Sequence, residues 1–302
     1  MRTSAFPAVR LRVTSDLHVE KVSEANVLAA LYALVRDPDV HHAAVMAGDL
    51  AEARDCAAVA RETYPNACAI MIVPGNHEGY GCTEGRDGAI RMMREGAARL
   101  PGVHVLHDDV LDLPLPCGAG ETIVRFIGTT LWTDYDLCGD RAAAMALCDK
   151  KLNDHRAAGG DAGAPPHPAS ETLERHLRSR VWMRAALAAV PDELPVVAVT
   201  HHLPSLRSVA PRWYGETASA TLASHADELL GRAHLFVHGH AHDSCMWRYN
   251  PAASERPTLV VCNPLGMPSG TGWQNTDFNP RLDVELRPTY NPRSSWTAFP
   301  VP

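Results

Sequence analysis

The chain has 302 residues, of which 46% are hydrophobic and 21% charged, and these proportions are ordinary for a globular protein whose core needs no disulfide support. Its formal net charge of −7 argues against broad binding to nucleic acids or anionic membranes, because both attract basic surfaces. No stretch approaches the roughly 18 uninterrupted apolar residues of a membrane-spanning helix.

The eight cysteines include no C-x-x-C pair, and residues 1–10 lack the long apolar segment of a secretory signal peptide. Free cysteine behaves as a small buried hydrophobic residue. We therefore expect reduced thiols and a cytoplasmic protein.

Apolar runs alternate with amphipathic segments along the N-terminal third of the chain. The pattern predicts strands at 9–15, 42–47, 67–73 and 103–106, and helices at 23–36, 50–63 and 89–100. Strands that alternate with helices predict a parallel or mixed sheet with helices packed on it.

The remainder of the chain is richer in predicted strands. We expect strands at 122–127, 195–200, 234–238, 244–249, 258–262 and 282–286, and helices at 141–152, 170–190 and 217–230. Residues 157–169 are rich in Ala, Gly and Pro and predict a mobile loop, which is either a lid or a passive insertion. Residues 288–302 contain four prolines and predict an extended tail along the surface. No internal repeat is visible, and we expect a single domain over residues 1–302.

Polar residues follow five of the predicted strands at the point where each strand ends. The five segments are Asp16-Leu17-His18, Gly48-Asp49, Gly75-Asn76-His77-Glu78, His201-His202 and Gly239-His240-Ala241-His242. Ligands of open α/β sheets collect at the carboxyl ends of strands. Carboxylate, imidazole and amide ligands suit Mn, Fe or Zn, and the lack of thiolates argues against a structural zinc site. The sequence therefore predicts a metal centre assembled from strand ends.

In this order, the five segments resemble the motifs of the calcineurin-like metallophosphoesterase superfamily, with Gly48-Asp49-Leu50-Ala51-Glu52 as the second motif. The resemblance implies an α/β fold in which two mixed β-sheets pack as a sandwich flanked by α-helices. It also implies two divalent or trivalent metal ions, whose identity among Mn, Fe and Zn stays open. One ion would be held by Asp16, His18, Asp49 and His242, and the other by Asp49, Asn76, His201 and His240.

The resemblance further implies that His77 faces the substrate and aids departure of the leaving group. Two adjacent ions lower the pKa of a shared water, and the resulting hydroxide attacks phosphorus in line with the leaving oxygen. Glu52 lies three residues after Asp49 in a predicted helix, so we expect it to approach the cluster and orient His77. The alternative is that Glu52 is a solvated acid at the start of a helix.

Three further residues are candidates for substrate contact. Similarity to a bacterial branch of the superfamily extends over Gly128–Trp132, Asn153–Arg156 and Cys262–Pro264. That similarity implies that Arg156 meets substrate phosphate, which guanidinium binds in a bidentate manner. Asn263 follows another strand, and Tyr80 lies in a glycine-rich loop that could line the mouth of the site. His202 and His238 are either supports of the metal ligands or residues of the core.

The sequence departs from the protein phosphatase branch, in which an arginine directly follows the second motif, because Ala53 follows Glu52 here. We therefore expect a hydrolase of the phosphodiesterase-like branch that acts on a small, nucleotide-like phosphodiester or phosphomonoester. A metal-dependent nuclease and a non-catalytic binding protein that keeps the fold remain alternatives. We expect no membrane partner, and the oligomeric state stays open.

Overall fold

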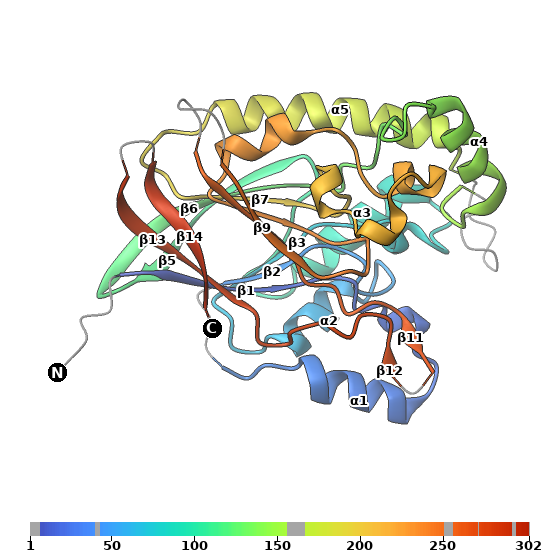
Figure 1. The fold of residues 1–302 in the computed structure, drawn as a ribbon. Helices are drawn as coiled ribbons and strands as arrows, with labels where there is room; N and C mark the ends of the chain where they lie inside the picture. Colours follow the sequence, from blue (N-terminus) through green and yellow to red (C-terminus); the bar gives the residue numbers. More distant parts are fainter. Residues whose placement is uncertain are drawn as a thin grey trace.

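The computed structural model describes residues 7–39, 43–155, 167–250, 256–270, 272–291 and 294–301. Two six-stranded sheets pack face to face, and helices cover their outer faces (Figure 1). The predicted sandwich of two mixed sheets is confirmed. Within the described part of the chain, no helix combines the length and the apolar character that a membrane span requires.

The first sheet contains the N-terminal strands and the last two strands of the chain. Its order is β14-β13-β1-β2-β3-β4, and β1 to β4 run parallel. The bounds are β1 Val9–Thr14, β2 Ala43–Met46, β3 Ala69–Ile72, β4 Val103–Val105, β13 Asp283–Asn291 and β14 Ser294–Val301. The helices that cover its outer face are α1 Ala25–Val35, α2 Cys56–Thr63 and α3 Gly85–Ala97.

The second sheet has the order β5-β6-β7-β8-β10-β9, with parallel pairing from β6 to β10 and an antiparallel strand at each edge. The bounds are β5 Asp109–Cys117, β6 Gly120–Thr129, β7 Val196–Thr200, β8 Leu235–His238, β9 Cys245–Tyr249 and β10 Thr258–Cys262. The remaining elements are α4 Arg141–Lys151, α5 Ala169–Ala188 and a small hairpin of β11 Pro268–Ser269 and β12 Gly272–Trp273.

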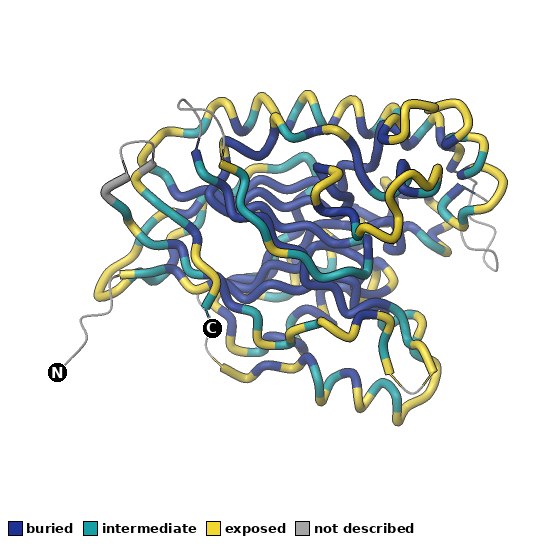
Figure 2. Tube along the Cα trace, in the orientation of Figure 1, coloured by how far each residue is buried: buried dark blue, intermediate teal, exposed yellow. Residues whose placement is uncertain are grey.

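The central strands of each sheet are buried on both faces. Val9, Leu11 and Val13 alternate along β1 and meet Phe126 and Val237 of the second sheet in the core between the sheets. The outer face of the first sheet packs on α1 to α3, and that of the second sheet packs on α5. The strands accordingly form a buried centre between partly exposed helices (Figure 2). Strands buried on both faces explain the near-continuous apolar runs in the sequence.

Two predicted helices are shorter or different in kind. α2 begins at Cys56 rather than near residue 50, because residues 50–55 form turns after Asp49. Residues 217–230 fold into the short 3-10 helices η5 Thr217–Thr221 and η6 Asp227–Arg232 in place of an α-helix. The apolar residues of this region nevertheless pack in the core, as Leu229 and Leu230 do.

Two strands lie where the prolines argued against regular structure. β5 contains Pro114 and Pro116 and was not predicted, and β14 replaces the predicted meandering tail by pairing with β13. Both are edge strands, and an edge strand tolerates proline because one side of it forms no ladder hydrogen bonds. The predicted loop at 157–169 lies outside the described residues, except for its last three positions.

Candidate metal centre

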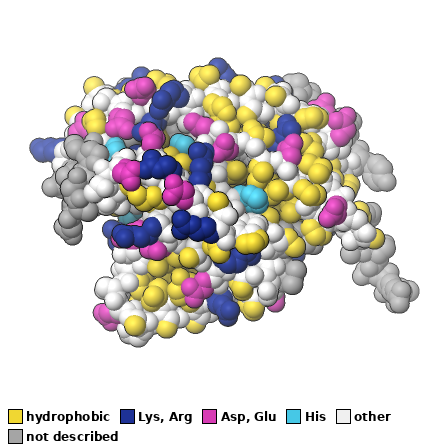
Figure 3. All heavy atoms as spheres, turned by 180° about the vertical axis from the view of Figure 1, so that it is seen from behind, with side chains coloured by type: hydrophobic (Ala, Val, Ile, Leu, Met, Phe, Trp, Pro, Cys, Tyr) yellow, Lys and Arg dark blue, Asp and Glu magenta, His cyan; other side chains and the backbone are white. Residues whose placement is uncertain are grey.

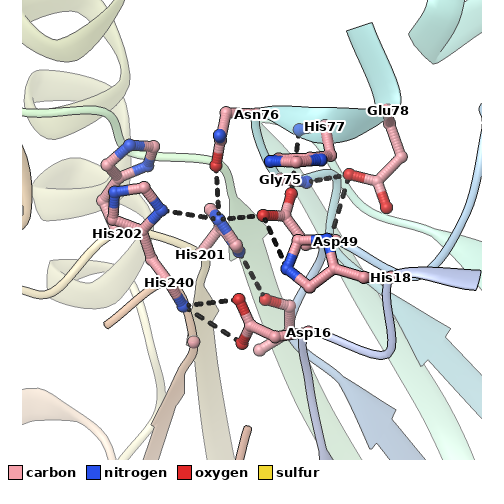
Figure 4. Close-up of polar contacts among 12 residues, drawn as sticks. Asp16, His18, Asp49, Gly75, Asn76, His77, Glu78, His201, His202 and His240 are labelled. Carbon is pink, nitrogen blue, oxygen red and sulfur yellow. Dashed lines mark hydrogen bonds and ion pairs between the residues drawn. The ribbon is translucent and has the colours of Figure 1, made fainter. Parts of the chain in front are cut away.

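Seven predicted ligands converge at the carboxyl ends of parallel strands from both sheets. The loop after β1 supplies Asp16 and His18, and the other ligands follow β2 (Asp49), β3 (Asn76), β7 (His201) and β8 (His240 and His242). Figure 4 shows the labelled members pointing toward one another from these separate strands. Backbone hydrogen bonds join the loops, including those from Asp16 N to Gly48 O at 2.9 Å and from Gly239 N to His201 O at 3.0 Å. The two sheets thus meet at one polar centre.

Three groups of side-chain atoms lie close together, and one of them joins Asp49 to His18 and to His77. The other two groups contain the predicted ligands. Within the group of Asp16, His18 and His242, and within that of Asp49, His201 and His240, the atoms lie within 4.8 Å of one another. Asp49 Oδ2 lies 3.8 Å from His18 Nε2 and 3.4 Å from His201 Nε2. The Asn76 oxygen Oδ1 lies 2.8 Å from His201 Nε2 and completes the second group. The Asp49 carboxylate therefore lies between His18 of one group and His201 of the other.

The hydrogen bonds of the histidines fit a metal site. Nδ1 of His18 contacts the Glu20 carboxylate at 3.1 Å, and Nδ1 of His201 contacts the Ala47 carbonyl at 2.8 Å. Nδ1 of His242 contacts Gln274 Oε1 at 2.5 Å. All three partners accept hydrogen bonds, so each of these histidines donates from Nδ1 and turns its Nε2 atom toward the centre, where it can bind a cation once it carries no proton. Metal-binding histidines are typically oriented in this way.

The backbone at the centre is strained. Among the described residues, nine non-glycine residues have a positive φ, and five of them are predicted ligands, namely Asp16, His18, Asp49, His240 and His242. Such strain concentrates at functional sites. The side chains of Asp16 and His18 are brought together by the left-handed backbone of both residues and not by the alternation of an extended strand. Gly48, with φ +86°, permits the next loop to approach, since a Cβ there would lie 2.6 Å from His201 Nδ1.

The charges of the centre depend on one another. Burial alone would raise the pKa of Asp49, but the charges of His201 and His77 hold it well below its usual value. Burial alone would lower the pKa of His201, but the charge and hydrogen bond of Asp49 raise it to about 10. The buried carboxylates thus need compensating positive charge. A proton on His201 contributes to it in the absence of metal, and a metal ion competes with that proton.

His77 lies beside this centre, but its partner is not the predicted one. His77 Nδ1 donates to Glu20 Oε1 at 2.8 Å, and the His77 backbone N–H donates to Asp49 Oδ1 at 2.9 Å. The Glu52 side chain is 48% exposed and pairs with Arg54. The expected contact between Glu52 and His77 is therefore wrong, because Asp49 and Glu52 do not lie on successive turns of a helix.

Glu20 was missed because its position depends on backbone geometry that the sequence does not reveal. The left-handed φ of 48° at His18 leads into the short helix η1 Val19–Lys21, which turns Glu20 back toward His77. Burial alone would raise the pKa of Glu20, but hydrogen bonds from His18 and His77 lower it to about 2. The only sequence signal is an acid two residues after the first histidine motif.

Glu78 connects two of the loops that carry ligands. Its carboxylate accepts hydrogen bonds from the backbone N–H groups of Asp49 at 3.2 Å, Leu50 at 2.8 Å and Gly75 at 2.7 Å. Figure 4 shows it on the side of Asp49 that faces away from His240. The side chain is only 1% exposed, and burial together with the charge of Asp49 raises its pKa to about 7. Glu78 therefore positions loops rather than substrate.

The three candidates for substrate contact fare differently. Tyr80 lies at the centre, with its ring centroid 4.3 Å from that of His77 and its hydroxyl donating to Asp154 Oδ1 at 2.7 Å. Asn263 is buried and donates to the carbonyls of Val13 and Asn279, both at 2.8 Å, so it fixes the end of β1 and faces no cavity mouth. Arg156 lies outside the described residues.

The two histidines without an assigned role are both buried. The ring of His202 stacks on that of the ligand His240, with centroids 4.1 Å apart, and therefore supports it. His238 bonds Ser208 Oγ through Nε2 at 2.8 Å and occupies a core position behind the ligand loop. Among the described residues, neither His202 nor His238 belongs to the groups of side chains whose potential ligand atoms lie close together.

Comparison with known proteins agrees with this geometry. The model of the calcineurin-like phosphoesterase family matches residues 9–244. A phosphopantetheinyl hydrolase from Mycobacterium tuberculosis is similar in structure, with a TM-score of 0.59 and 17% identity over 87% of this chain and 92% of that one. A dimetal phosphatase from Danio rerio aligns with a TM-score of 0.42 and 12% identity over 98% and 99% of the two chains. No curated protein matches the sequence significantly.

Proposed function

Because the chain belongs to the calcineurin-like phosphoesterase family and is a metal-dependent hydrolase, we propose that it hydrolyses phosphodiesters or phosphomonoesters of small molecules at the centre described above. The observation that supports this most directly is the convergence of seven ligand side chains, with the Asp49 carboxylate between the two groups. The proposed ligand sets are Asp16, His18, Asp49 and His242 for one ion, and Asp49, Asn76, His201 and His240 for the other. When bound, two such ions supply Lewis-acid activation of the phosphoryl group and of the attacking water.

In this proposal, His77 is the group that assists the leaving oxygen. Burial alone would lower its pKa, but the charge of Asp49 and the hydrogen bond to Glu20 raise it, which favours the protonated ring. Its Nδ1 is engaged by Glu20, so Nε2 is available to donate a proton to the departing alcohol. The backbone contact with Asp49 keeps the ring next to the centre.

We further propose that the organic part of the substrate lies in a neighbouring groove. A cavity of about 330 Å³ opens between residues 21–30 and the β11–β12 hairpin, and its lining includes Lys21, Asn26, Pro268 and Trp273. One lining residue of the groove extends toward the centre, since Lys21 Nζ lies 5.6 Å from the centroid of the Tyr80 ring. This volume is at the lower end of the range of small-molecule pockets, about 300–1,000 Å³.

The charge distribution favours a small molecule over a nucleic acid. On the face shown in Figure 3, Lys and Arg side chains lie among Asp and Glu side chains rather than in one basic stripe. Several arginines of the described chain are paired with acids, as in Arg125–Asp112 at 2.7 Å and Arg175–Asp87 at 2.8 Å. A nuclease would need a basic track for the phosphate backbone.

Metal analysis followed by an activity screen tests the proposal. The purified protein should bind two metal ions per chain and should hydrolyse at least one member of a panel of cyclic nucleotides, dinucleotides, monoesters and phosphopantetheinyl esters. Asp49→Asn, which weakens the bridging position, should lose both metal and activity. A protein that carries two ions and is inert toward the whole panel would contradict hydrolysis and favour a binding role. Salt-dependent cleavage of oligonucleotides would favour the nuclease alternative.

A further inference from the structure

Asn76 is unlike the other proposed ligands because its amide has two chemically different ends. Its oxygen Oδ1 faces the centre, 2.8 Å from His201 Nε2, and can bind a cation, whereas its NH₂ group cannot. The two ends have nearly the same shape, so packing alone selects poorly between the two orientations. A rotation of the amide by 180° would replace a metal ligand with a hydrogen-bond donor.

The NH₂ end of this amide is bound by a carboxylate. Asn76 Nδ2 donates to Asp154 Oδ1 at 2.9 Å, from a loop that follows α4. An ionised carboxylate accepts hydrogen bonds and donates none, so only the NH₂ end of the Asn76 amide can face it. We propose that Asp154 is a positioning residue that fixes the Asn76 amide with its oxygen toward the metal centre.

Neighbouring groups hold Asp154 in this position. Tyr80 donates its hydroxyl to the same Oδ1 atom at 2.7 Å. The guanidinium of Arg86 donates to the backbone carbonyls of Asn76 at 3.1 Å and Asp154 at 3.3 Å, so it connects the two loops. Arg86 is itself only 5% exposed and stacks on Trp132, with its Cζ 4.2 Å from the ring centroid. These contacts hold the Asp154 side chain in one place, so it can fix the orientation of the Asn76 amide.

Asp154 belongs to the segment Asn153–Arg156, in which Arg156 is the predicted phosphate contact. Through its hydrogen bond to Asn76, Asp154 gives this segment a role at the metal centre. The inference rests on the proposed metal centre but not on hydrolysis, because its test measures metal binding directly.

The sharpest test is Asp154→Asn, which preserves shape but introduces an NH₂ donor. The new NH₂ group can donate to Asn76 Oδ1, so the side chain at 154 no longer excludes the flipped ligand. We expect the affinity for the second manganese ion, measured by calorimetry, to fall about 10- to 100-fold, the usual effect of removing a partner of a metal ligand. The electron paramagnetic resonance signal of a coupled manganese pair should weaken in parallel. An affinity equal to that of the unmodified chain would overturn the inference.

The exchanged pair, Asn76→Asp with Asp154→Asn, separates positioning from a merely structural role. An aspartate at 76 has two equivalent oxygens, so either orientation presents a ligand, and an asparagine at 154 can donate to the other oxygen. We expect this double variant to recover most of the lost manganese affinity relative to Asp154→Asn alone. Failure to recover it, in a variant that unfolds at the normal temperature, would contradict positioning through Asn76.

Asp149→Asn is the matched control. Asp149 belongs to α4, and its Oδ1 accepts the Ala169 N–H at 2.7 Å, a bond that an amide oxygen also accepts. It has no contact with Asn76 among the hydrogen bonds of the described residues. Manganese affinity should be unchanged in this variant. An equal loss in the two variants would show that any Asp→Asn change in this region disturbs the site, and would overturn the specific role of Asp154.

Discussion

At the scale of single residues, the centre separates groups that would hold metal from groups that orient them. Three histidines direct Nε2 inward because Glu20, the Ala47 carbonyl and Gln274 occupy their Nδ1 atoms. Glu20 serves twice, since it also binds His77. The proposed chemistry therefore depends on residues that would never contact the substrate.

Replacement of His77 by alanine should slow hydrolysis without removing metal. General acid assistance contributes about 10²- to 10⁴-fold, so that loss is expected for esters of poorly acidic alcohols. Esters of p-nitrophenol, which leaves readily without a proton, should be affected far less. Steady-state rates on the two ester types, with metal content measured in parallel, make the comparison. Equal losses on both types would contradict the assignment of His77 as the acid.

The variants Glu20→Gln and Glu52→Gln distinguish the observed partner of His77 from the one expected from sequence. Glu20→Gln removes the charge that stabilises protonated His77, and we expect turnover at saturating metal to fall at least tenfold. Glu52→Gln changes an exposed side chain that pairs only with Arg54 among its described contacts, and turnover should stay within about twofold. A larger effect at Glu52 than at Glu20 would refute this arrangement of the site.

At the scale of elements, the ligand loops approach so closely that they require glycine. A Cβ on Gly239 would lie 2.6 Å from Asp16 Oδ2 and 2.8 Å from the Ala47 carbonyl oxygen. The loop after β8 thus packs directly against the loops after β1 and β2, and no side chain fits between them.

Gly239→Ala should therefore push His240 and His242 away from Asp16. We expect loss of bound metal and a lower unfolding temperature, measured by elemental analysis and calorimetry. Gly120→Ala is the matched control, because a Cβ there meets no atom within 4 Å. Normal metal content in Gly239→Ala would show that the loops tolerate separation, contrary to this account.

Helices and strands that follow simple periodic patterns could be predicted from the sequence. Those whose bounds or existence depend on tertiary contacts could not. The buried parallel strands and the ends from which Asp16, Asp49 and His201 project were predicted from apolar runs followed by polar residues. The start of α2 was not predicted correctly, because the chain forms turns after the left-handed Asp49 and the helix begins only at Cys56. β5 and β14 were not predicted, because the strands tolerate their prolines at the sheet edges and edge position is a property of the fold.

The same limit applies to residues of the site. Ligands could be predicted because they occur in motifs with fixed spacing. Glu20 and Asp154 could not, because each acts on a residue more than fifty positions away, His77 and Asn76 respectively, and only the folded chain brings them into contact.

At the scale of the whole molecule, the proposed ions connect two sheets. Asp16, His18, Asp49 and Asn76 follow strands of the first sheet, whereas His201, His240 and His242 follow strands of the second. Removing metal should leave both sheets folded, because the core between them is continuous and apolar. Metal removal should also leave the carboxylates and imidazoles of the centre close together with no cation between them.

Chelation should therefore lower the unfolding temperature without abolishing cooperative unfolding. Metal at 100 times its dissociation constant contributes about 2.7 kcal/mol to the stability of a one-site protein, and two ions contribute more. Calorimetry with and without added manganese measures the shift. Hydrogen exchange should increase at the loops after β1, β2, β7 and β8 in the chelated protein. An unfolding temperature independent of metal would contradict the connection between the sheets.

Anomalous X-ray diffraction from crystals grown with manganese would locate the ions directly. We expect two anomalous peaks on either side of Asp49 Oδ2, one bounded by Asp16, His18 and His242, and the other by Asn76, His201 and His240. A single peak, or peaks remote from Asp49, would contradict the proposed metal centre.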